Sequence, residues 1–92
     1  MEIVINTCYG GFSLSKRAMK FLGVSNPYVY ESDRTNAMLI EAVVTLGRKA
    51  DGLHAHLEVV EIPDGSFWEI REHAGIESVC YSATELRYAN GK

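Results

Sequence analysis

The residues best suited to chemistry lie in a short glycine-containing stretch near the start of the sequence. An apolar run at residues 3–5 leads into a loop at residues 7–14, which contains Cys8 and the pair Gly10 and Gly11, and a helix signal follows. A junction between a strand and a helix gathers unpaired backbone N–H groups and the positive end of the helix dipole, so it can hold an anion without a basic side chain. This loop is therefore the first candidate site.

The side chains around the loop favour binding over catalysis. Tyr9 and Phe12 flank the two glycines, where an aromatic ring can stack on a base or fill a pocket of a partner. Hydrogen-bonding groups and a cation lie nearby in the sequence. We therefore expect a nucleotide-like ligand bound by Asn6, Thr7, Tyr9, Gly10, Gly11, Phe12, Ser13 and Arg17.

Enzymatic use of the same loop is the less favoured alternative. A phosphatase-like loop needs an arginine six positions after its cysteine, and Leu14 occupies that position after Cys8. The G-x-x-x-x-G-K-[ST] run of nucleotide triphosphatases, the G-x-G-x-x-G of dinucleotide folds and the G-x-S-x-G elbow are also absent. A tight turn and a structural free cysteine explain these residues better, and we assign no catalytic residue and no cofactor.

Two histidines raise the possibility of a metal site. His54 and His56 are two residues apart, so on a strand they would point the same way. Further ligands from Cys8, His73 or a carboxylate would have to converge through the fold, and the usual Cys and His spacings are absent. We therefore interpret them as polar surface residues and expect no metal.

Composition limits the class of protein. At 92 residues the chain predicts one domain, 1–92, whose small core would benefit from homo-oligomer formation. The net charge of −3 argues against general nucleic-acid binding, although residues 1–50 carry six basic and four acidic side chains and residues 51–92 carry three and eight. An anion should therefore bind near the first half. No apolar run reaches the ~18 residues of a membrane span, so we expect an intracellular protein that does not bind membranes.

Apolar periodicity and turn residues predict the elements of the first half. Residues 2–6 are typical of a buried strand, and residues 16–22 of a short helix capped by Ser13 or Ser15 and ended by Gly23. Residues 28–31 alternate as a short strand would. From Asn36 as the capping residue, residues 37–50 repeat apolar positions at helical spacing.

The second half reads as consecutive strands. Residues 54–62 and 67–73 are predicted to form a hairpin around the turn at 63–66, and residues 78–82 add a third strand. Residues 83–92 show no clear period and are expected to be a loosely docked tail. The resulting β-α-β-α-β-β-β order predicts an α+β domain with two helices packed on one face of a largely antiparallel sheet.

The opening segment also carries a resemblance. It reads IVINTCYGGFSLS over residues 3–15 and resembles the opening of a family of short proteins encoded by bacteriophages and prophages. The likeness continues in LIEAV at 39–43, VVEIPD at 59–64 and WEI at 68–70, and is poor after Gly75. This resemblance implies phage origin and action in the cytoplasm of an infected host bacterium, but it gives no residue a role.

Two functions from different classes follow. The first is a phage counter-defence factor that binds or sequesters a nucleotide-derived small molecule through the loop at 7–14 and the start of the helix at 16–22. The second is a module that inhibits a host protein through an exposed edge strand or an acidic sheet face carrying Glu58, Glu69 and Glu72.

Overall fold

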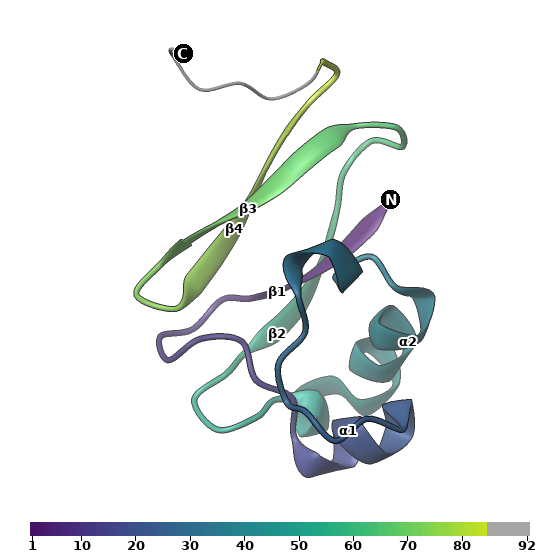
Figure 1. The fold of residues 1–92 in the computed structure, drawn as a ribbon, viewed down its shortest axis with the longest axis vertical. Helices are drawn as coiled ribbons and strands as arrows, with labels where there is room; N and C mark the ends of the chain where they lie inside the picture. The colour runs from purple at the N-terminus through teal and green to yellow at the C-terminus, as the bar shows by residue number, and fades with distance from the viewer. Residues whose placement is uncertain (85–92) are drawn as a thin grey trace.

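Strand β1 (Glu2–Asn6) lies at the centre of the fold, between a layer of helices and a β-hairpin (Figure 1). The computed structural model describes residues 1–84, so the tail expected at 83–92 lies, from residue 85 on, outside the described residues. The expected α+β class is confirmed. The other elements are α1 (Lys16–Leu22), α2 (Ala37–Leu46), β2 (Leu57–Glu61), β3 (Phe67–His73), β4 (Ile76–Ser82) and the 3-10 helices Glu31–Asp33 and Gly47–Ala50.

The strands form two antiparallel sheets of two strands each. β1 pairs with β2 in the register Ile3↔Val60, and β3 pairs with β4 in the register Ile70↔Val79. Both helices lie on one face of the β1–β2 sheet, as the sequence predicts, and the β3–β4 hairpin lies against the other face (Figure 1). The fold therefore has three layers.

The hairpin predicted between residues 54–62 and 67–73 is wrong, because each strand has a different partner. β2 pairs with β1, because the buried backbone N–H and C=O groups along that edge of β1 need hydrogen-bond partners. The turn at 63–66 carries the chain from one sheet to the other. β3 instead turns back through Ala74 and Gly75, with φ angles of 54° and 90°. Two consecutive residues with positive φ match the right-handed twist of a hairpin, which favours the β3–β4 pairing.

The strand predicted at residues 28–31 is also wrong. Tyr30 is extended, with φ −62° and ψ 154°, but the segment has no partner strand among residues 1–84. Side chains take the place of a ladder: Asn26 Oδ1 accepts from the Tyr28 N–H at 2.9 Å, and Arg34 Nε donates to the Val29 carbonyl at 2.9 Å. The alternating pattern therefore reflects extended backbone outside a sheet.

Capping residues set the ends of both helices. Ser15 caps α1 through its hydroxyl, which accepts from the Ala18 N–H at 3.0 Å, and Gly23 ends the helix in the left-handed conformation. Asn36 caps α2, as predicted, with its Oδ1 accepting from the N–H groups of Met38 and Leu39. The helix predicted over 37–50 continues past Leu46 as a 3-10 turn.

We expect Ser15→Ala to lower the free energy of unfolding by about 1 kcal/mol, because the first turn of α1 loses its side-chain acceptor. Ser13→Ala is the matched control, since Ser13 was the other capping candidate and does not cap the helix in the structure. Urea denaturation of both variants tests this. Equal losses would contradict the assignment of the cap to Ser15.

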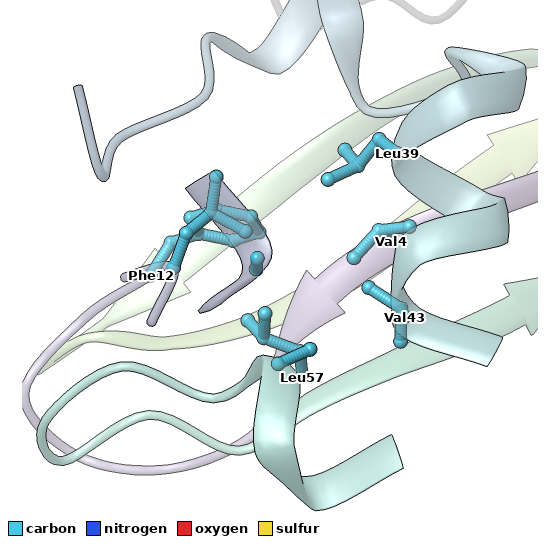
Figure 2. Close-up of a cluster of buried hydrophobic side chains, with 8 residues drawn as sticks. Val4, Phe12, Leu39, Val43 and Leu57 are labelled. Atoms are coloured by element: carbon cyan, nitrogen blue, oxygen red, sulfur yellow. The ribbon is translucent and has the colours of Figure 1, made fainter. Parts of the chain in front are cut away.

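The core lies on both faces of β1, which explains why the apolar run in this strand is continuous. Val4 packs toward the helices with Leu57 of β2 and with Leu39 and Val43 of α2 (Figure 2). On the opposite face, Ile3 and Ile5 pack with Ile62 and with Trp68, Ile70 and Val79 of the hairpin. Alternate residues of one strand therefore join the helix layer and the hairpin layer.

The edge of β1 that faces away from β2 is closed by two other segments. The Val4 N–H donates to the Arg34 carbonyl at 2.9 Å, and the Asn6 N–H donates to Glu77 Oε1 at 2.8 Å. Arg34 Nη1 also donates to the Val4 carbonyl at 3.2 Å. These bonds occupy groups that would otherwise be free to pair with another strand.

Candidate functional site

Asn6, just before the candidate loop, is a buried residue whose side chain links three separate segments of the backbone by hydrogen bonds. Its side chain is 0% exposed and holds three backbone groups. The Nδ2 group donates to the carbonyls of Cys8 at 2.7 Å and Gly75 at 2.8 Å, and Oδ1 accepts from the His56 N–H at 2.8 Å. Both amide hydrogens are therefore already used within the protein.

Backbone conformation favours glycine at both glycine positions of the loop, and close packing restricts Gly10 as well. Gly10 and Gly11 have φ angles of 105° and 92°, a region that residues with a Cβ rarely adopt. A Cβ on Gly10 would come within 2.8 Å of the His54 Cβ, and one on Gly75 would collide with the backbone nitrogens of Gly11 and Gly10. The hairpin turn of β3–β4 thus rests directly on this loop, on the side of its N–H groups.

Phe12 brings the loop against a buried ion pair. The Arg34 guanidinium lies 3.8 Å from the centre of the Phe12 ring and forms two hydrogen bonds with Glu77: Nη1 to Oε1 at 2.7 Å and Nη2 to Oε2 at 3.0 Å. Arg34 is only 1% exposed. An arginine that forms a bidentate pair with a carboxylate and stacks on an aromatic ring fixes the relative positions of the segments that it joins.

The remaining candidate residues of the loop do not converge. The Thr7 hydroxyl donates to the His56 carbonyl at 3.1 Å, and the Ser13 carbonyl accepts from the Gly52 N–H at 2.7 Å. Tyr9 is 67% exposed, and Arg17 is exposed on α1. Of the eight residues named from the sequence, Asn6, Gly10, Gly11 and Phe12 lie near the hairpin turn or the ion pair, and the other four lie apart.

The cysteines and histidines do not gather into a common site in the described residues. Cys8 and Cys80 are free and partly exposed. His56 Nε2 lies 3.0 Å from Glu58 Oε2 on the exposed surface, and His54 has a positive φ of 65° beside Gly10. Within residues 1–84, no group of three or more His, Cys, Asp or Glu side chains is placed to hold a metal ion.

The carboxylates proposed for an acidic docking face lie on different sheets. Glu58 is on β2, whereas Glu69 and Glu72 are on opposite faces of β3. Glu69 pairs with Arg71 at 3.0 Å, and this hydrogen bond raises the pKa of the Arg71 guanidinium above its ordinary value. Glu72 Oε2 accepts from the Gly75 N–H at 2.6 Å. These three residues therefore do not form one continuous acidic surface.

A cavity within residues 1–84, which we call the tyrosine pocket, meets the loop at residues 7–14 (the glycine loop) only at Leu14. It has a volume of about 500 Å³ and lies between the end of α1, the segment 24–33 and the start of α2. Its walls are mainly apolar, with two tyrosine rings and three polar side chains. The lining residues are Leu14, Leu22, Val24, Asn26, Tyr28, Val29, Tyr30, Asp33, Asn36, Met38 and Leu39.

A smaller cavity of about 210 Å³ borders the glycine loop at Gly11 and Phe12. Its lining includes three carboxylates, Glu31, Glu72 and Glu77, but one guanidinium, that of Arg34. Like charges repel at these short separations, so this cavity disfavours a phosphate. Its acidic groups are also engaged: Glu31 Oε2, for example, accepts from the Ile70 N–H at 2.7 Å.

The sequence-based predictions do not include the tyrosine pocket. Asn36 was recognised only as a helix cap, and Tyr28 and Tyr30 only as part of a strand. One signal was present in the sequence: two tyrosines two positions apart in extended backbone project to the same side. In the structure both tyrosines are more than half exposed, at 51% and 70%. Two large exposed rings on one side are typical of a contact surface.

Comparisons with known proteins leave the functional assignment to the geometry. Searches with protein-family models, curated proteins and solved structures found no match to this chain. Among the helices within residues 1–84, none has the length and apolar character needed to cross a membrane.

Proposed function

We propose that this protein binds a nucleotide-derived small molecule in the tyrosine pocket and does not transform it. In the setting that the phage resemblance implies, the protein would sequester a host signal within the infected bacterium. The proposal keeps the class of ligand expected from the sequence and moves the ligand from the glycine loop to the cavity beyond Leu14.

The observation that carries the proposal is the composition of the tyrosine pocket. A cavity of about 500 Å³ falls within the range of small-molecule sites, roughly 300–1,000 Å³, and such sites combine apolar walls with a few polar groups. Tyr28 and Tyr30 pack edge to face, with ring centres 5.8 Å apart and planes at 86°. This geometry leaves ring surface on which a flat heterocycle can stack.

The described residues of the pocket do not include the side chains that most often act as nucleophile or general base. Among residues 1–84, the polar side chains that line it are two amides, two phenols and one carboxylate, with no histidine, cysteine or lysine. Nucleophilic or acid–base catalysis requires an activated nucleophile or a paired acid and base. Binding without turnover is therefore the function that these groups support best.

The first test is native mass spectrometry of protein purified from bacteria with and without phage infection, followed by denaturation and identification of released small molecules. The measurement reports the oligomeric state and any bound cargo together. A released nucleotide-sized mass would support the proposal and supply the ligand for calorimetry. Empty protein from both sources, together with no calorimetric binding of nucleosides, nucleotides or dinucleotides, would overturn it.

Tyr30→Ala is expected to weaken binding of that ligand about tenfold, because stacking of a base on an aromatic side chain contributes roughly 1–3 kcal/mol. Tyr9→Ala is a matched control, since Tyr9 is 67% exposed and Tyr30 is 70% exposed, but Tyr9 lies on the glycine loop. Isothermal titration calorimetry of both variants separates the two locations. Loss of binding in Tyr9→Ala alone would place the ligand at the glycine loop.

A further inference from the structure

The polar groups of the tyrosine pocket indicate which end of a nucleotide it takes. The orientation of both asparagine amides is fixed by bonds to the backbone: Asn26 Oδ1 accepts from the Tyr28 N–H at 2.9 Å, and Asn36 Oδ1 accepts from the N–H groups of Met38 and Leu39 at 2.8 and 3.2 Å. Their oxygens therefore face these backbone N–H groups. Each Nδ2 group, which has no protein acceptor among residues 1–84, remains to donate.

Asp33 supplies the complementary acceptor. It is the charged residue among the side chains that line the pocket, it is exposed, and its carboxylate has no hydrogen-bond or ion-pair partner among the described residues. A carboxylate accepts two hydrogen bonds side by side and has no proton to give at neutral pH. It therefore matches a ligand group that presents two adjacent donors.

The charge of the pocket excludes a phosphate from its interior. No lysine or arginine of the described part of the chain lines the cavity, and the Asp33 carboxylate makes the local potential negative. Phosphate sites are instead built from arginine, lysine or free backbone N–H groups. Asn36 already occupies the N–H groups at the start of α2.

From these observations, and resting on the proposed function, we infer that the tyrosine pocket holds the uncharged nucleoside end of the ligand, with Asp33 accepting a pair of donors and the phosphates lying outside. The donor pair has two possible sources, the N–H edge of a base or the 2′,3′-diol of a ribose. Asn26 and Asn36 then donate to acceptors on the same uncharged portion. Such a pocket discriminates against ligands that carry their charge at the buried end.

The test is calorimetry with the four common ribonucleosides and their 5′-triphosphates on wild-type protein, Asp33→Asn and Asp64→Asn. Asp64 is a control for net charge, because its side chain is 94% exposed and lies outside the pocket. We expect the tightest nucleoside to bind at least as well as its triphosphate and to lose about tenfold in affinity in Asp33→Asn, because a hydrogen bond to an ionised acceptor becomes a neutral one. Asp64→Asn should bind as wild type does.

The 2′,3′-dideoxy form of that nucleoside then identifies the donor pair. If its affinity no longer depends on Asp33, the diol is the source, and if the tenfold dependence remains, the base is. Triphosphates that bind more than tenfold tighter than nucleosides, or unchanged affinity in Asp33→Asn, would overturn the inference while leaving the proposed function intact. Absence of binding by both series would overturn the inference, and it would overturn the proposed function as well if dinucleotides also failed to bind and the purified protein carried no cargo.

Discussion

Arg34→Met is expected to lower the free energy of unfolding by roughly 3–5 kcal/mol, because it leaves the Glu77 carboxylate buried without its countercharge. The substitution keeps much of the apolar stem of the side chain. It also removes the donors to the carbonyls of Val29 and Val4. The loss should appear in urea denaturation as a lower midpoint with an unchanged slope.

Two further variants separate the ion pair from a general effect of removing an arginine. Arg17→Met removes an exposed arginine on α1 and should change stability by less than about 0.5 kcal/mol. Adding Glu77→Gln to Arg34→Met should recover part of the loss, since the buried charge disappears while an oxygen remains to accept from the Asn6 N–H. A loss below about 1 kcal/mol in Arg34→Met would show that Glu77 is not held by this pair.

Gly75→Ala should cost roughly 2–4 kcal/mol, since it combines an unfavourable backbone conformation with a collision inside a packed region. The φ angle of Gly75 is 90°, and its new Cβ would meet the backbone of Gly10 and Gly11, which has no side-chain freedom with which to yield. Because the hairpin turn rests on the glycine loop, both segments would have to move.

The matched control for this prediction is Gly65→Ala. Gly65 has a φ of 80°, but no atom lies within 4 Å of a Cβ built there, so the substitution isolates the backbone cost, about 1 kcal/mol. Thermal unfolding of both variants measures the difference. If the two melting temperatures fall equally, the contact between the hairpin turn and the glycine loop contributes nothing to stability.

Those parts of the fold that depend on neighbouring residues could be predicted from the sequence. The bounds of β1, α1 and β3 and the cap at Asn36 all follow from apolar periodicity and capping residues within a few positions. The pairing of the strands could not, because it depends on which distant segment covers each face of β1. The 63–66 turn is compatible with a hairpin and with a crossing between sheets, and only the packing of Ile3 and Ile5 decides between them.

The candidate site was also hard to predict from the sequence, because contacts between distant residues decide the role of each side chain. Gly10 and Gly11 can be recognised in the sequence as turn residues, but their close neighbours, His54 and Gly75, are far away in the sequence. Arg34 lies in a polar connection and looks like a surface residue, because its burial depends on a carboxylate 43 positions later. The tyrosine pocket likewise combines the end of one helix with the start of the next, which no single motif records.

The bonds of Asn6 have a consequence for synthesis of the protein on the ribosome. This residue is held by partners 50, 69 and 71 positions later in the chain. The segment containing β1 therefore emerges long before the groups that complete its hydrogen bonds, and the edge of this apolar strand that faces away from β2 must wait unpaired. Because β3 and β4 are joined by a two-residue turn, they can pair within microseconds of emerging. The last step of folding is then the packing of β4, the last strand to be synthesised, against β1, the first. Nascent chains stalled before Glu77 should therefore depend on chaperones to keep β1 from aggregating.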